Sequence, residues 1–236
     1  MNSTLVVDEH NELKEVRQKP FPDQPKPIKI IATIISYIFH PVFVPVYIIY
    51  FLLFIHPYLF AGYNFNNKVL VLAQSFMMLT FFPLVSVGLL KALKFINSIF
   101  LHTQKDRIIP FIACMTWYFW LWYVWNNMGK SNDYAEIPPE AIKLAFAIFI
   151  STILGLMANI KMKISLHAIA MGLMLSFIIL LGLTQDLNFG IYISVALLVT
   201  GLVLTSRFII SDHSLYEVYG GLAVGIISML IAYWLG

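Results

Sequence analysis

The run LHAIAMGLMLSFIILLGL, from Leu166 to Leu183, decides the fold. It contains no Asp, Glu, Lys or Arg, and its apolar residues are continuous rather than alternating with polar ones. About 20 mainly apolar residues suffice for one helical crossing of a bilayer, where backbone polar groups are satisfied only in helices or closed barrels. Because the run is continuous, a helix is favoured over a barrel strand. We therefore expect a membrane-spanning helix here.

Six other runs of the 236-residue chain meet the same requirement. They are Ile31–Ile55, Val69–Leu90, Ile108–Trp125, Ala141–Asn159, Phe189–Thr205 and Leu215–Leu235. Hydrophobic residues make up 60% of the chain and charged residues only 11%, a balance foreign to soluble domains. The sequence predicts an all-α fold, a polytopic membrane helical bundle of about seven transmembrane helices. Its two ends are then on opposite sides of the membrane.

The first 29 residues differ in composition from the rest. Ten charged side chains lie within the first thirty positions, and four prolines stand between Pro20 and Pro27. With few large apolar residues, such a segment cannot bury enough surface to offset the entropy lost on ordering. We therefore expect residues 1–29 to form a mobile polar tail and residues 30–236 to form the transmembrane domain.

Composition also limits the partners and indicates an orientation. Cys114 is the single cysteine, so a disulfide framework or a cysteine-based metal cluster is excluded, and the dispersed net charge of +3 does not indicate nucleic acid. Twelve basic residues lie on the N-terminal side of the predicted bundle and three on the other side. If the four that belong to the candidate site are left out of the count, eight remain against three. Because basic residues favour the cytoplasmic side, we expect a multi-pass protein of the cell membrane with its N-terminus and site in the cytoplasm.

Three clusters of polar residues lie at the ends of predicted helices. They are Lys105-Asp106-Arg107 with Pro110, the segment Lys161–His167 and the segment Ser206–Glu217. Even numbers of crossings separate the clusters, so all three face the same side of the membrane. Together they offer two histidines and up to five cations. Cations beside helix N-termini are typical of an anion site, and phosphate is the anion we expect.

The spacing in the third cluster indicates a chemistry. His213 and Glu217 are four residues apart, which places them on one face of a helix start. The carboxylate can then bind one ring nitrogen and leave the other as a nucleophile or base. His167, in a separate loop, suits a general acid that protonates the leaving oxygen from the opposite side. The sequence thus supplies both halves of a phosphoryl-transfer site, and we expect neither a metal nor a cofactor.

Other polar and small residues have simpler interpretations. Three histidines have no partner at such a spacing, and we expect them at the membrane interface: His40, His56 and His102. Three glycines of the last run are spaced for close helix packing: Gly220, Gly221 and Gly225. An open alternative for the basic residues of the clusters is simple anchoring of the helix ends.

The third cluster resembles a known signature. Ser206-Arg207-x5-His213-x3-Glu217 is similar to the third signature of the type 2 phosphatidic acid phosphatase (PAP2) superfamily, Ser-Arg-x5-His-x3-Asp. Ser165-Leu166-His167 resembles a degenerate form of the second signature, Pro-Ser-Gly-His. Lys105-Asp106-Arg107 with Pro110 resembles the first, Lys-x6-Arg-Pro, without its six-residue spacing. The resemblance covers the chain from Lys105 to its end and implies a PAP2-like helical core.

The resemblance also implies roles for individual residues. His213 would be the nucleophile that forms a phosphohistidine, Glu217 would orient its ring, and His167 would protonate the leaving alcohol. The residues that would hold the phosphoryl oxygens are Lys105, Arg107, Lys163, Ser165, Ser206 and Arg207, with Lys161 as an alternative to the first signature's cations.

The function implied is that of a metal-independent membrane lipid phosphatase. It would hydrolyse a phosphomonoester or diphosphate of a lipid, such as phosphatidic acid, phosphatidylglycerol phosphate or polyprenyl diphosphate, with the substrate's tails in the bilayer. The main alternative is a catalytically silent PAP2-like protein that binds or moves an anionic lipid. A prenyltransferase would need aspartate-rich motifs for Mg²⁺, and no Asp-x-x-x-Asp pair occurs in these loops.

Overall fold

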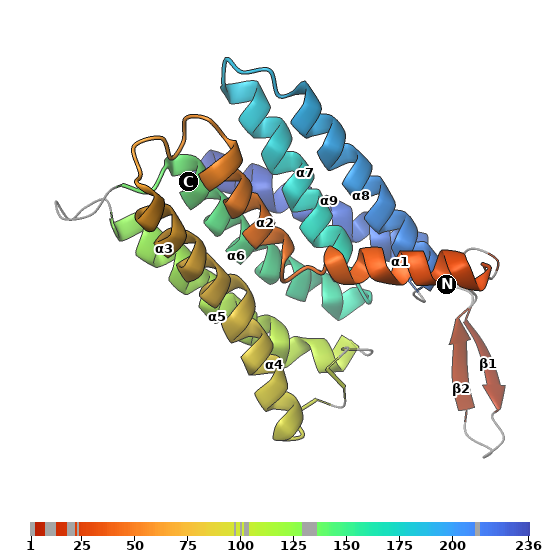
Figure 1. The fold of residues 1–236 in the computed structure, drawn as a ribbon. Coiled ribbons are helices and arrows are strands. Elements are labelled where there is room, and N and C mark those ends of the chain that lie inside the picture. Colours follow the sequence, from red (N-terminus) through yellow and green to blue (C-terminus); the bar gives the residue numbers. More distant parts are fainter. Residues whose placement is uncertain are drawn as a thin grey trace.

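The computed structural model describes residues 3–7, 13–17, 22, 24–96, 98–99, 101, 104–128, 136–210 and 213–236. Helices dominate this part of the chain, as the continuous apolar runs predict. The strands described are β1 (Ser3–Val7) and β2 (Leu13–Arg17), which pair antiparallel and lie outside the helical bundle (Figure 1). Both belong to the segment 1–29, whose mobility stays a prediction.

Six helices of the described chain are long and apolar enough to cross a membrane. The first is continuous from α3 (Phe65–Phe76) through the π-helical segment η2 (Met77–Phe81) to α4 (Phe82–Ala92). The other five are α5 (Gln104–Met128), α6 (Pro139–Lys161), α7 (Leu166–Thr184), α8 (Gly190–Ile210) and α9 (Leu215–Leu235). The chain is therefore a multi-pass membrane protein, and the predicted all-helical bundle is confirmed.

Six long helices stand where seven were predicted, because the first apolar run is broken. It forms α1 (Lys26–Ile38), a turn, α2 (Val44–Tyr50) and the π-helical segment η1 (Phe51–Ile55). Pro41 lacks an N–H and disfavours a helical conformation at the residue before it, so α1 cannot continue into α2. The remaining helix, 44–55, is about 18 Å long, well short of the roughly 30 Å of hydrocarbon in a bilayer.

Helix α1 lies across one end of the bundle instead of along it (Figure 1). At this end, α5, α7 and α9 begin and α6 and α8 end, so the three polar clusters of the sequence meet there. We call it the α1 end and the opposite end, which holds the C-terminus, the far end. The prediction that the clusters share one side of the bundle is confirmed.

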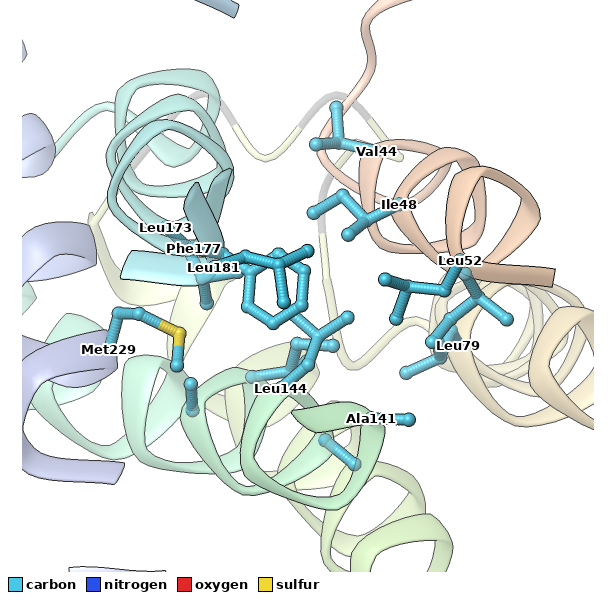
Figure 2. Close-up of a cluster of buried hydrophobic side chains, with 14 of the residues drawn as sticks. Val44, Ile48, Leu52, Leu79, Ala141, Leu144, Leu173, Phe177, Leu181 and Met229 are labelled. Carbon is cyan, nitrogen blue, oxygen red and sulfur yellow. The ribbon is translucent and has the colours of Figure 1, made fainter. Parts of the chain in front are cut away.

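The apolar core is built from the short helix α2 and the long helices together (Figure 2). Its labelled side chains are Val44, Ile48, Leu52, Leu79, Ala141, Leu144, Leu173, Phe177, Leu181 and Met229. Although α2 is too short to span a bilayer, one of its faces is fully buried against this core. The same packing holds in place the turn that leads into α2. It therefore also holds α1 close to the start of α7 and the end of α8.

Helices α7 and α9 approach each other closely because glycines meet backbone across their contact. A Cβ on Gly225 would collide with the carbonyl oxygen of Ile169, and one on Gly172 would collide with that of Leu222. Gly221 is also tightly packed, against the start of α7. The close packing predicted for the last helix is thus confirmed at Gly221 and Gly225, whereas a Cβ at Gly220 would make only ordinary contact with Met162. It fixes the starts of α7 and α9, which carry the candidate histidines, relative to each other.

Candidate functional site

The start of α9 holds a buried pair of a histidine and a carboxylate. The Nδ1 atom of His213 lies 3.2 Å from Oε2 of Glu217, and the two residues are only 4% and 1% exposed. The same Oε2 accepts the N–H of Ser214 at 2.9 Å, while the Ser214 hydroxyl accepts the N–H of Glu217 at 3.3 Å. This reciprocal capping box fixes the carboxylate in place. The predicted pairing is confirmed, and it turns Nε2 of His213 away from Glu217.

Burial and charge together set the protonation of His213. Burial lowers the pKa of the imidazole below its usual 6.5, the hydrogen bond to Glu217 opposes that shift, and the charges of Arg207 and Arg107 add to it. With its pKa below 6.5, the ring is neutral at pH 7. A neutral imidazole has the lone pair that a nucleophile or base requires.

Arg107 is buried in the cluster, whereas Lys105 is not. Arg107 is 6% exposed and donates from Nη1 to the carbonyl of Ile164 at 2.6 Å and from Nε to that of Leu101 at 3.0 Å. Its charge also interacts with Glu217. Lys105 is exposed, because residues two apart on a helix point to different faces. The structure therefore brings one of the two predicted cations of α5 to the site.

The loop between α6 and α7 is tied to the start of α9. The backbone N–H of Ser165 donates to the carbonyl of Glu217 at 3.1 Å. The Ser165 hydroxyl is completely buried and has no hydrogen-bond partner among the described residues. A buried polar group without a partner costs about 1–3 kcal/mol, which an anionic oxygen at this place could recover. In the same segment, Lys163 is half-buried and Lys161 is exposed.

Two neighbouring candidates in the last turn of α8, Ser206 and Arg207, make different contacts. Arg207 donates from Nη1 to the hydroxyl of Ser36 on α1 at 2.8 Å, and its charge interacts with that of Arg107. The hydroxyl of Ser206 is buried and donates to the carbonyl of Val203 within its own helix at 2.7 Å. Ser206 therefore uses its proton inside α8, and we find it less suited than Arg207 to hold a phosphoryl oxygen.

His167, in the first turn of α7, contacts two residues that the sequence does not mark as functional. Its Nε2 lies 3.0 Å from the carbonyl oxygen and 3.2 Å from the hydroxyl oxygen of Ser36. The ring of His40, from the turn after α1, meets the ring of His167 edge-on, with centroids 5.4 Å apart. His167 also interacts electrostatically with His213. The two predicted histidines therefore belong to one cluster, and α1 completes it.

Two of the three histidines without a partner spacing lie among the described residues, and their place at the membrane interface stays a prediction. His40 packs into the site, where burial and the charge of Arg207 lower its pKa. His56 is buried at the far end, with Nε2 2.7 Å from the Gln185 side-chain oxygen. His102 lies outside the described residues. His40 differs from His56 in that its long-range contact is with a candidate residue, His167, and no local spacing encodes that contact.

The cluster at the α1 end carries an excess of positive charge. Among the described residues near this end, Lys105, Arg107, Lys161, Lys163 and Arg207 are cationic, whereas Glu217 and the buried Asp106 are anionic. Guanidinium groups bind phosphate by charge-assisted hydrogen bonds. Among the described residues, no group of three or more His, Cys, Asp or Glu side chains is placed to hold a metal ion. The geometry thus suits an anionic oxygen ligand next to a neutral imidazole.

Comparisons of the chain with protein-family models, with curated proteins and with solved structures found no match.

Proposed function

We propose that this chain is a membrane lipid phosphatase of the PAP2 type, with His213 as its nucleophile. The observation that carries the proposal is the buried hydrogen bond between His213 and Glu217, with the charges of Arg107 and Arg207 acting on the same ring. A neutral imidazole held by a carboxylate beside two guanidinium groups has the parts that phosphoryl transfer through histidine needs.

The proposed reaction has two steps. In the first, Nε2 of His213 bonds to phosphorus while the bond from phosphorus to the lipid oxygen breaks. His167 enters this step with both ring nitrogens protonated, a form that the negative charge of the bound phosphate favours, and gives the lipid oxygen one of these protons. In the second, water attacks the phosphohistidine, the phosphorus–nitrogen bond breaks, and His167 takes up a proton from the water. Arg107 and Arg207 stabilise the charge on the phosphoryl oxygens in both steps. The buried hydroxyl of Ser165 is a further donor to those oxygens.

The substrate we propose is a lipid that carries a phosphomonoester or a diphosphate. Its tails stay in the bilayer while its headgroup enters the α1 end, which lies at the ends of the membrane-spanning helices. Phosphatidic acid, phosphatidylglycerol phosphate and polyprenyl diphosphate all fit this description. From the excess of basic residues near this end, we place the site on the cytoplasmic face of the cell membrane.

One observation favours a second candidate, a catalytically silent protein that binds or moves an anionic lipid. Ser36 holds both Arg207 and His167, so the groups that would act on a substrate already have a partner. Such a protein would keep its affinity for lipid phosphates without His213, whereas an enzyme would lose its turnover.

Phosphate release from a panel of lipid phosphates, in detergent with EDTA, separates the two candidates. We expect release by the wild type and a loss of about 10³-fold or more in His213→Ala, because the nucleophile is gone. The matched control is His56→Ala, a buried and hydrogen-bonded histidine at the far end, which should retain activity. Equal activity in His213→Ala would refute the assignment, and no release from any lipid by the wild type would favour the silent binder.

A further inference from the structure

A single residue of α1 contacts two of the groups assigned to phosphate chemistry. Ser36 is 5% exposed, and its hydroxyl accepts a hydrogen bond from Nη1 of Arg207 at 2.8 Å. The same hydroxyl oxygen lies 3.2 Å from Nε2 of His167. One neutral oxygen thus sits between a guanidinium group and an imidazole in the interior of the cluster.

The break after α1 makes the second contact of Ser36 possible. In a continuing helix, the N–H of His40 would bond to the carbonyl of Ser36; here it bonds to the carbonyl of Tyr37 at 3.3 Å. The Ser36 carbonyl is one of the helix-end acceptors that need an outside partner, and Nε2 of His167 lies 3.0 Å from it. Because a carbonyl oxygen only accepts, Nε2 carries the proton of this bond.

The hydroxyl of Ser36 has the contacts that an oxygen of a bound phosphate monoester would have. We propose that α1 is a lid, in which Ser36 holds the place of a phosphate oxygen between Arg207 and His167 until a phosphate group displaces it. The inference rests on the proposed function only in taking the ligand to be a phosphate group. It adds that the site is closed when empty and opens by withdrawal of α1.

The surfaces of α1 suit such a movement. Its outward side chains are exposed and apolar: Ile30, Ile31, Ile34, Tyr37 and Ile38. Lys26 and Lys29 lie at its start, so the helix combines an apolar face with basic residues, as helices that lie in a membrane interface do. Withdrawal of Ser36 leaves this apolar face in the lipid interface. It also separates Ala32, Ile35 and Phe39 from the bundle, and the contacts of the phosphate have to outweigh that loss.

Removing the hydroxyl of Ser36 tests whether this hydroxyl competes with phosphate for Arg207 and His167. In Ser36→Ala the carbonyl still accepts from His167, but Arg207 loses its neutral partner, so phosphate no longer has to displace it. Because phosphate no longer competes with a hydrogen bond to a charged group, we expect the dissociation constant for phosphate to fall by about tenfold or more. Thr33→Ala is the matched control, since Thr33 lies one turn earlier on α1 and bonds only to the carbonyl of Lys29 in the contacts described.

Calorimetric titration of the purified chain gives these constants in two arms. One arm uses inorganic phosphate. The other uses detergent micelles that contain the phosphonate analogue of phosphatidic acid, which the proposed reaction cannot hydrolyse, with phosphatidylcholine micelles as the reference. Tightening in both arms shows that the phosphate group alone opens the lid, and tightening only with the lipid phosphonate shows that the lipid headgroup does. Equal or weaker binding by Ser36→Ala in both arms would overturn the proposal.

Hydrogen–deuterium exchange on the wild type gives a second test that does not depend on a variant. We expect the amides of residues 26–38 to exchange several-fold faster when phosphate or phosphatidic acid is bound. Slower or unchanged exchange of α1 on binding would refute a lid. Neither test requires turnover, so a failed lid and a failed nucleophile assignment are distinguishable: the first shows in binding and exchange, the second in the loss of release with His213→Ala.

Discussion

The α1 end and the far end of the bundle both hold ionisable side chains, but they are assembled differently. At the α1 end, Arg107 and Arg207 come from different helices and interact with each other. At the far end, Glu140 and Lys143 lie one turn apart on α6 beside a cavity of about 120 Å³. The ammonium group of Lys143 stands 4.9 Å from the ring centroid of Tyr233. Oε2 of Glu140 is buried without a hydrogen-bond partner among the described residues. The far end thus carries opposite charges on one helix, whereas the α1 end collects like charges from distant parts of the chain.

This difference teaches where to look for chemistry in a membrane bundle. Arg107 is buried and Arg207 is half-buried. Like charges in such positions repel each other and lose hydration, so they persist only where other groups compensate or where function requires them. An anion between Arg107 and Arg207 would relieve that repulsion. Glu140 and Lys143 have opposite charges, so no repulsion between them has to be relieved. Convergence of cations, more than their number, distinguishes the candidate site.

Among the tests of this difference between the two ends, the largest effect on phosphate release is expected from removing an arginine of the α1 end. Arg207→Ala should lower phosphate release by about 10²-fold or more, because a charge-assisted contact to the phosphoryl group is lost. Lys143→Ala, at the far end, should leave release within about twofold. Both are measured as kcat/KM with phosphatidic acid in mixed micelles. A similar loss in the two variants would remove the distinction between the two ends.

A smaller effect is expected from the contact that aligns α7 with α9. Gly225→Ala places a methyl group against the backbone of α7 and should destabilise the fold by about 1–3 kcal/mol, with a lower Tm in detergent. Gly201→Ala on α8 is the matched control, because nothing lies within 4 Å of its Cβ position. Its Tm should stay the same or rise slightly, since alanine has the higher helix propensity. Equal Tm values for the two variants would contradict the close packing.

The smallest effect concerns the pH dependence of the proposed reaction. Burial places the pKa of His213 below 6.5, so release should be constant near neutral pH and fall at lower pH as the ring is protonated. Glu217→Gln retains a side chain that can cap α9 but removes a charge that raises this pKa. The acid limb should therefore move to lower pH, with a loss in rate of about tenfold. An acid limb that moves to higher pH would contradict the assigned pair.

Local patterns predicted much of this architecture. Continuous apolar runs identified the long helices, and the four-residue spacing identified the pair of His213 and Glu217, because both are determined by neighbours on one helix. The capping box of Ser214 and Glu217 has an equally local signal, Ser-x-x-Glu before an apolar run. The sequence therefore assigns Glu217 a second, structural task beside its proposed one.

The rest depends on contacts between distant segments. Ser36 is 131 residues from His167 and 171 from Arg207, so no spacing rule relates them. Pro41 stands inside an apolar run of sufficient length, and hydropathy alone does not show that α1 turns across the bundle. Likewise, Arg107 is buried and Lys105 is exposed because of which face of α5 packs against the bundle, and the local sequence does not show which face that is.

The central claim is that His213 forms a covalent bond to phosphorus. The most direct test is to mix the purified protein with phosphatidic acid labelled with ³²P in its phosphate, stop the reaction with alkali within one turnover, and locate the label by peptide mapping. We predict an alkali-stable, acid-labile label on the peptide that carries His213, and no label on that peptide in His213→Ala. Phosphate release by the wild type without any label on His213, or labelling that survives in His213→Ala, would contradict the account.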